Sequence, residues 1–278
     1  MKITNTSKLL TALVLGLSTA TTFAAFSGSD DFNDNSQDLS KWGTDAVQGG
    51  GALNETSQVL RYTTSGATSN DFAVRPWIAN TGSFTSNWIL QIDVNIPALT
   101  LATGQSFLFG LRVVNGDDPT DRFLTALELD NFSGIPNRHF LSAVHVNGVN
   151  QGEIKSDSTS TSAAVRIRYD AATTTLFSEF DADGAVGGYN FTNFDSRNIS
   201  SWNMTAASVF QGAAWGASEG NVVISSANNV AGDNFLATPE PSSVILILSG
   251  AALCLRRRSL RAHERIAYPL VPKRGFRP

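Results

Sequence analysis

Two carboxylates stand two positions apart in the segment Leu127–Ser133, which reads LELDNFS. If this segment is a strand, Glu128 and Asp130 point to the same face, with Cβ atoms about 6.6 Å apart by the strand rise. Paired carboxylates are the groups that act as nucleophile and acid/base in glycoside hydrolysis. The alternative is a polar strand face or rim without a catalytic role.

The Glu-x-Asp spacing resembles the catalytic strand of family 16 glycoside hydrolases, in which a second Glu follows four or five residues after the first. In this chain those two positions hold Phe132 and Ser133. A mechanism that needs two carboxylates cannot proceed with only one of them. We therefore expect no catalytic residue, and Glu128 and Asp130 are candidates only for contact with a ligand.

Residues with metal-binding chemistry are few. His139 and His145 fall on one expected strand and on one face of it, but two ligands do not complete a zinc site. Asp181-Ala182-Asp183-Gly184 resembles the start of a calcium loop, yet position twelve of that loop is Thr192 instead of Glu. We expect no cofactor. A structural Ca²⁺ stays open, held by loop aspartates that include Asp117, Asp118 and Asp121.

Tryptophan rings could stack on the C–H faces of sugars. The chain has five tryptophans, and most tryptophans of a β-sandwich pack in the core or at its rim. We expect at most two to face a ligand. The candidates are Trp42, Trp77, Trp202 and Trp215.

The composition excludes several classes of partner and chemistry. Residues 25–238 contain 22 acidic and 10 basic side chains, which gives a charge of −12 and disfavours nucleic acid and anionic lipid as partners. The single cysteine is Cys254. The central region therefore has no disulfide, thiolate metal site or thiol nucleophile, and its stability must come from burial of a core.

Short apolar runs separated by Gly, Asn, Asp, Ser and Thr clusters indicate strands rather than helices. In VRIRYDAATTTLFSEFD, apolar residues alternate with arginines over Val165–Tyr169, and Asp170–Thr174 predicts a turn of a hairpin with one buried face. Asn147–Ser162 and Gly184–Ser201 are expected to be long loops. The other expected strands are Val59–Thr63, Phe72–Arg75, Trp88–Ile96, Gln105–Val114, Phe123–Leu129, His139–Val146, Leu176–Asp181 and Val222–Ser225.

The opening DDFNDNSQDLSKWGTDAVQGGGALNE, this hairpin and the closing segment GDNFLAT together resemble concanavalin A-like, or laminin-G-like, jelly rolls. The resemblance implies an all-β fold, a two-sheet antiparallel β-sandwich over residues 25–237, with the first and last strands side by side. Another type of β-sandwich is the alternative.

Both ends of the chain have the pattern of targeting segments. Lys2 and Lys8, the apolar run Leu9–Leu17 and the small residues of Thr22-Phe23-Ala24 predict a secretory signal peptide over residues 1–24; the alternative is an N-terminal core helix. Near the other end, Val244–Leu255 would make a helix of about 18 Å, shorter than the roughly 30 Å hydrocarbon core. The stop-transfer cluster Arg256, Arg257 and Arg258 would stay on the cytoplasmic side.

The triplet Pro239, Glu240 and Pro241, the short apolar run and the arginines together resemble the PEP-CTERM sorting signal of Gram-negative bacteria, over residues 238–261. The resemblance implies transient anchoring in the inner membrane by a short transmembrane helix, which an exosortase-type membrane transpeptidase removes at the triplet. It also implies export to the cell surface, often alongside exopolysaccharide or biofilm matrix. A permanent tail anchor is the alternative. Residues 262–278 extend beyond the usual signal and are expected to be a disordered basic tail.

Three functions follow from these features. The first is an exported, non-catalytic β-sandwich of the cell surface, associated with exopolysaccharide and with carbohydrate as its expected ligand. The second is a divergent jelly-roll glycan hydrolase or lyase that uses Glu128 with a partner absent from the motif. The third is a structural surface or matrix protein without a ligand.

Overall fold

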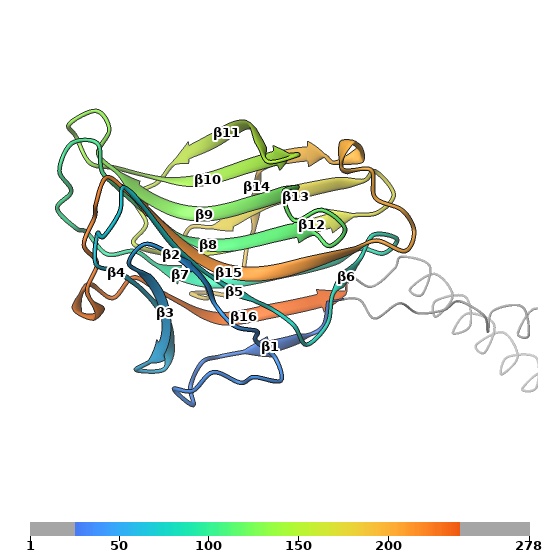
Figure 1. The fold of residues 1–278 in the computed structure, drawn as a ribbon, viewed down its shortest axis with the longest axis horizontal. Helices are drawn as coiled ribbons and strands as arrows, with labels where there is room; N and C mark the ends of the chain where they lie inside the picture. The colour runs from blue at the N-terminus through green and yellow to red at the C-terminus, as the bar shows by residue number, and fades with distance from the viewer. Residues whose placement is uncertain (1–25, 240–278) are drawn as a thin grey trace, which may run out of the picture. The chain divides into compact units, whose positions relative to one another are not determined.

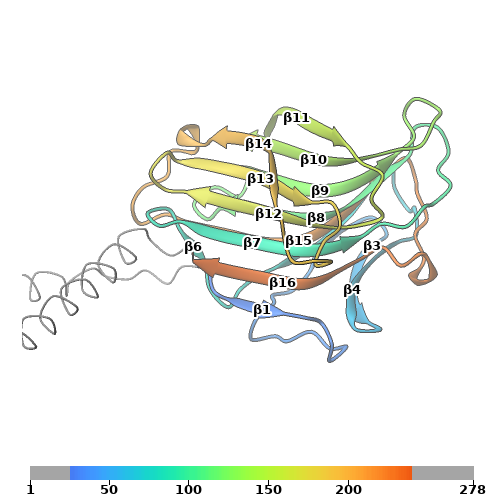
Figure 2. The same ribbon diagram turned by 180° about the vertical axis from the view of Figure 1, so that it is seen from behind.

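The computed structural model describes residues 26–239, and these form two antiparallel β-sheets packed face to face (Figures 1 and 2). The front sheet, which faces the viewer in Figure 1, has the strand order β11-β10-β9-β8-β15-β5-β2, with β6 paired to β15. Its strands are β2 Ala46–Gln48, β5 Asn70–Pro76, β6 Gly82–Ser83, β8 Ser106–Asn115, β9 Arg122–Asp130, β10 Asn137–Val146, β11 Val149–Asp157 and β15 Val209–Glu219.

The back sheet has the order β14-β13-β12-β7-β16-β4-β3, with β1 paired to β16 (Figure 2). Two single-turn 3₁₀ helices, η1 Ser200–Trp202 and η2 Ser226–Asn228, lie in connections. The strands of the back sheet are β1 Gly28–Asp30, β3 Gly51–Thr56, β4 Val59–Thr64, β7 Trp88–Asn95, β12 Ser162–Asp170, β13 Thr175–Asp181, β14 Thr192–Asn198 and β16 Ala231–Pro239.

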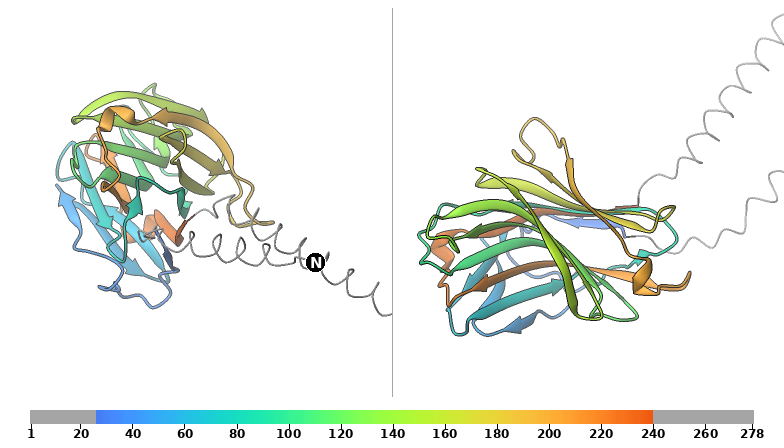
Figure 3. Two further views of the ribbon diagram at one scale, coloured as in Figure 1. Left: turned by 90° about the vertical axis from the view of Figure 1, so that its right-hand side faces the viewer. Right: turned by 90° about the horizontal axis from the view of Figure 1, so that it is seen from above.

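The core lies between the sheets because the strands alternate buried apolar side chains with side chains of the outer faces. On β8, Phe107, Phe109 and Leu111 are fully buried, and on β12 the same holds for Val165 and Ile167. The two sheets curve together, as the view from above in Figure 3 shows.

The predicted two-sheet antiparallel sandwich is confirmed. The first and last strands pair, with Gly28 opposite Ala237. The hairpin is also confirmed, since β12 and β13 pair from Ala164 opposite Asp181 to Asp170 opposite Thr175. Sheet structure continues through Pro239, two residues beyond the expected end of the domain.

Three predictions about individual segments were wrong. Asn147–Ser162 contains the edge strand β11, and Gly184–Ser201 contains the edge strand β14; both are polar because edge strands are largely exposed. Val222–Ser225 is not a strand, because only Ile224 makes a bridge, to Thr64, before η2 begins. The central strand β15 was missed.

In the part of the chain that the structure describes, no helix is long and apolar enough to cross a membrane. The expected signal peptide, Glu240 and Pro241, the apolar run Val244–Leu255, the arginine cluster 256–258 and the basic tail all lie outside residues 26–239. Of the expected sorting motif, only Pro239 is described, as the exposed last residue of β16.

Candidate functional site

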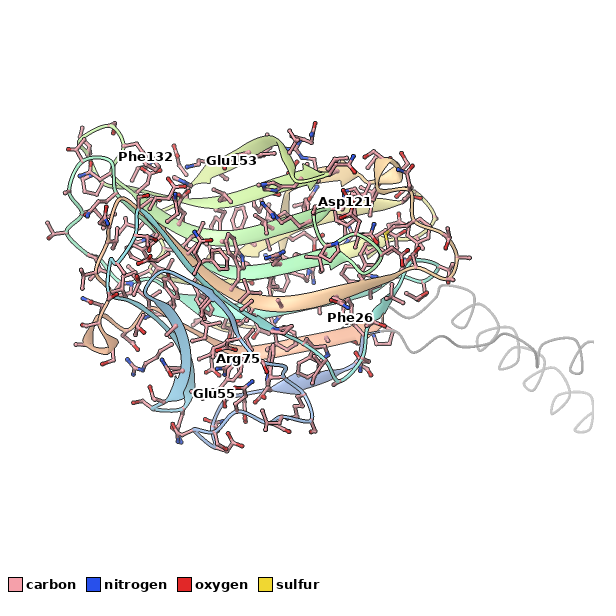
Figure 4. All side chains as sticks on the ribbon, viewed as in Figure 1. Phe26, Glu55, Arg75, Asp121, Phe132 and Glu153 are labelled. Carbon is pink, nitrogen blue, oxygen red and sulfur yellow. The ribbon has the colours of Figure 1, made fainter. Side chains whose placement is uncertain are left out.

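A groove of about 540 Å³ lies on the outer face of the front sheet, over β5, β15, β8, β9, β10 and β11. Leu124, Leu141 and Trp215 form part of its lining, together with Glu128, Glu219 and Lys155. In the view of Figure 4, Phe132 and Glu153 lie toward one end of the front sheet and Asp121 toward the other. Apolar and charged side chains thus share one concave surface, as in most ligand-binding sites.

The charged centre of the groove joins three strands. Glu128 and Asp130 point to the outer face of β9, as predicted, and His139 of β10 lies directly opposite Glu128. The Oε2 atom of Glu128 is 2.5 Å from Nε2 of His139 and 2.9 Å from Nζ of Lys155 on β11. Asp130 Oδ2 lies 3.4 Å from the same His139 nitrogen and 3.3 Å from the same ammonium. We call these four residues the charged cluster.

Contacts within the charged cluster shift the pKa values of Glu128 and Lys155. Burial by itself would raise the pKa of Glu128, but hydrogen bonds from His139 and Lys155 outweigh burial and hold that pKa below its ordinary value. Burial would likewise lower the pKa of Lys155, but the hydrogen bond and charge of Glu128 raise it. At neutral pH Glu128 is therefore an anion and Lys155 a cation.

Ligand atoms of Glu128, Asp130 and His139 lie within 4.8 Å of one another, a set that could contact a metal ion. The Lys155 ammonium, however, contacts both carboxylates, where a divalent cation would have to bind. Two carboxylates with a lysine already between them fit a salt-bridge network better than a metal centre. His145, six residues along β10, is about 20 Å from His139 by the strand rise and cannot complete the set.

Several of the loop aspartates considered for calcium accept hydrogen bonds within turns, and the structural Ca²⁺ stays a prediction. Asp118 accepts hydrogen bonds from the backbone N–H and hydroxyl of Thr120, and Asp121 accepts the backbone N–H of Asn147. Asp181 accepts the backbone N–H groups of Asp183 and Asn190. Such bonds close loops without an ion.

The floor of the groove is apolar. Leu124, Leu141 and Ala143 form a buried cluster on the outer face, against which Trp215 of β15 packs. The residue directly opposite Trp215 is Gly110 of β8, which has no side chain to compete for this space. Trp215 is half-buried, and its Nε1 atom is buried without a partner. A partly exposed ring face is the arrangement that a sugar can use for stacking.

A second glutamate reaches the groove from a strand far along the sequence. Glu219 of β15 lies opposite Ser106 of β8, which in turn lies opposite Asp130. Burial, followed by the charges of Glu128 and Glu153, raises the pKa of Glu219. Glu219 is thus a second glutamate on the lining of the groove, brought there from a distant part of the sequence.

Of the four tryptophans that were candidates for ligand contact, three are buried and one lines the groove. Trp42, Trp77 and Trp202 are at most 2 % exposed and cannot face a ligand. Trp42 packs edge-on against Trp77 and donates from Nε1 to Asp30. Trp215 alone of the four candidates lines the groove.

Three residues that line the groove were not predicted from the sequence: Lys155, Glu219 and Phe132. Lys155 and Glu219 lie on strands that were not predicted, so the sequence placed neither of them on a face. Phe132 is 48 % exposed and lines the groove, with the Lys155 ammonium 5.7 Å from its ring centre. Its position two residues after Asp130 was the available signal.

No protein-family model matches this sequence, and no curated protein matches it. Similar solved structures include peanut lectin with a nine-residue peptide (14 % identity, TM-score 0.45, 78 % of this chain and 99 % of that chain). Lectin II from Ulex europaeus is similar at 14 % identity and a TM-score of 0.44, over 76 % of this chain and 98 % of that chain. The Emp47p carbohydrate recognition domain is similar at 12 % identity and a TM-score of 0.43, over 77 % and 95 %. At these values the likeness says nothing of what this chain binds.

Proposed function

We propose that this protein is an exported, non-catalytic β-sandwich that binds a glycan in the groove of the front sheet. The observation that carries this proposal is the pairing of an apolar floor, built on Trp215, with charged and amide side chains around it. Sugars present C–H faces that pack on aromatic rings and hydroxyl groups that hydrogen-bond to polar side chains. Phe132, exposed at one end, would extend the stacking surface.

The non-catalytic role rests on the state of Glu128. Its Oε2 atom is held by His139 and Lys155, so this oxygen is already neutralised by two donors. A carboxylate engaged in this way can orient a ligand through its remaining acceptor capacity. It is a poor nucleophile as long as both contacts persist.

The binding experiment is a glycan array followed by calorimetric titration of the purified protein with each positive sugar. Trp215→Ala and Phe132→Ala should each lower the affinity roughly tenfold, the effect of one lost stacking contact. Tyr189→Ala is the matched control, because Tyr189 is an exposed aromatic that bonds Asp93 of the back sheet. A protein that binds no glycan at all would leave the structural surface or matrix role.

Sorting to the cell surface is the second half of the proposal. Its support is the sequence pattern, together with the position of Pro239 at the exposed end of β16. A processing enzyme would find the triplet directly after the sandwich ends. Mass spectrometry of the mature protein tests this: the expected C-terminus falls near residues 239–241, and a mature chain that retains Val244–Leu255 would indicate a permanent tail anchor.

A second candidate function is a glycan hydrolase, favoured by the presence of Glu128 and Glu219 in one groove with pKa values shifted in opposite directions. Glu219 would protonate the leaving glycosidic oxygen while Glu128 takes a proton from the attacking water. Reducing-end release from the sugars that bind is the assay. Turnover that Glu219→Gln abolishes would replace the non-catalytic proposal with this one; Glu219 is at the rim, so the variant should fold.

A further inference from the structure

Three basic side chains meet on the outer face of the front sheet, beyond the Trp215 end of the groove. Arg122 of β9 lies directly opposite His145 of β10. Arg112 of β8 lies opposite Leu124, two positions along β9 from Arg122 and therefore on the same face. Direct neighbours across strands have Cβ atoms about 5 Å apart and diagonal neighbours about 7–8 Å, so the three side chains can contact one ligand group.

These two arginines lack acidic partners. Among residues 26–239, the side chain of neither Arg112 nor Arg122 makes an ion pair or a hydrogen bond, and the Nε of Arg112 is buried without an acceptor. Other arginines of the sandwich do have partners. Arg75 pairs with Asp45 and Glu55, and Arg197 pairs with Asp195.

The carboxylates of Asp117 and Asp121, in the loop before Arg122, accept hydrogen bonds from other groups. Asp121 precedes Arg122 but accepts hydrogen bonds from Asn115 and from the backbone of Asn147. Asp117 accepts the hydroxyl of Ser208. These two carboxylates of the loop between β8 and β9 are therefore already engaged.

Half-buried cations without a counter-ion are costly. Burial, with the charge of Arg122 second, lowers the pKa of Arg112 to about 10, and burial also lowers the pKa of Arg122. Within the described residues nothing offsets this cost. An anion bound from outside would offset it, and a guanidinium can hold a carboxylate or sulfate through two parallel hydrogen bonds.

The arginine pair is continuous with the groove. His145 lines the groove and Leu124 belongs to its floor, while Arg122 and Arg112 are their respective cross-strand partners. Two further nitrogens here are buried without a partner, Nδ1 of His145 and Nε1 of Trp215. Glu128 and Glu219 lie toward the opposite end, where they would repel an anion, and Glu153 lies between the two ends, opposite Ala143. The groove thus has one end suited to an anionic group and one end that is not.

We propose that Arg112, Arg122 and His145 form an anion subsite that takes the carboxylate or sulfate of an acidic glycan. This inference rests on the proposed glycan-binding function and adds the substrate class: an oligosaccharide with an acidic sugar at the arginine end and sugars over Trp215. The polarity of the groove fixes the direction in which the chain lies.

The experiment compares acidic oligosaccharides with neutral counterparts of the same chain. The probes are oligomers of galacturonate and mannuronate with their methyl esters, and sulfated chondroitin oligomers with their desulfated forms. The acidic member of at least one pair should bind roughly tenfold tighter than its neutral counterpart, and added salt should weaken that preference. Arg112→Gln combined with Arg122→Gln should remove the preference while leaving affinity for the neutral member unchanged.

Arg197→Gln is the matched control, since Arg197 lies on β14 of the back sheet; it should retain the preference. Thermal unfolding of each variant checks that the fold is intact. Neutral glycans that bind as tightly as acidic ones would overturn the subsite and leave the proposed function standing, whereas no binding to any glycan would overturn both. Acetate or inorganic sulfate that binds as tightly as the acidic oligosaccharides would overturn the glycan assignment, and a preference that survives the double substitution would overturn the location.

Discussion

Glu128 of β9 and His139 of β10 face each other directly across the front sheet, with 2.5 Å between Oε2 and Nε2. Lys155 of the next strand approaches the same oxygen to 2.9 Å. Three adjacent strands are thereby joined on their outer face by charged side chains. This relationship makes the cluster a structural link between β9, β10 and β11.

Glu128→Gln should lower the free energy of unfolding by about 2–3 kcal/mol, because it removes the charge that both donors share in a buried site. Urea denaturation measures the change. Glu153→Gln is the control: Glu153 is exposed on β11, and its substitution should cost less than about 0.5 kcal/mol. Equal effects of the two substitutions would contradict a stabilising role for the charged cluster.

The contribution of Glu128 should also depend on pH. Its folded-state pKa is depressed below 4.5, so the unfolded chain binds a proton more readily and the stabilisation is present above that value. It is lost as the pH falls through the folded-state pKa. The difference in unfolding free energy between wild type and Glu128→Gln should therefore shrink between pH 6 and pH 3. A difference that grows on acidification would show the opposite shift.

His145 should lower the free energy of unfolding in a pH range different from that of Glu128. Burial, then the charges of Arg122 and Arg112, lowers its pKa from 6.5 to about 4; Glu153 of β11 is on the same face. A depressed histidine pKa means that the unfolded chain binds the proton first, so stability is complete above pH 6.5 and declines toward pH 4, by at most about 1.4 kcal/mol per pH unit. His145→Asn should flatten this part of the profile, measured by urea denaturation at several pH values.

Arg112→Met should stabilise the ligand-free protein by about 1 kcal/mol, because it replaces a half-buried unpaired cation with an apolar side chain of similar length. The rise in Tm measures the gain. Arg197→Met should give no such gain, since that substitution breaks the pair with Asp195. A loss of stability in Arg112→Met would reveal a partner for this arginine.

Trp42 and Trp215 should respond differently to truncation. Trp42→Ala removes a fully buried ring and the hydrogen bond to Asp30, and should cost about 3–5 kcal/mol. Trp215→Ala, which removes a half-buried ring from an outer face, should cost clearly less. Parallel denaturation curves test the ranking, and the reverse order would place Trp215 in the structural core.

Local pattern predicted the strands whose residues alternate. The segments of β7, β8, β9 and β12 were found because apolar side chains recur at every second position. The strand β15 was missed because its centre is small: Gly212, Ala213, Ala214, Gly216 and Ala217 give little hydrophobic signal. Small residues there still form a central strand, since Gly216 packs against the ring of Tyr62 and Gly212 against Leu90.

Edge strands were missed for a different reason. β11 is exposed along almost its whole length, so its residues are polar on both faces and read as a loop. The failure to predict β11 affected the prediction of the site, because Lys155 lies on this strand. With β11 taken for a loop, nothing placed a cation beside Glu128.

The sequence by itself determined that the central region is all-β, that it has no cysteine chemistry, and that Glu128 and Asp130 share a face, because strand periodicity and composition are local properties. Only the tertiary structure decided which side chains meet. Registers between β8, β9, β10 and β15 bring Arg112, Arg122, His145 and Trp215 together, and the same registers bring Glu219 toward Glu128. It also decided which tryptophans are buried, because the side of a sheet that faces the other sheet is fixed by how the two sheets pack.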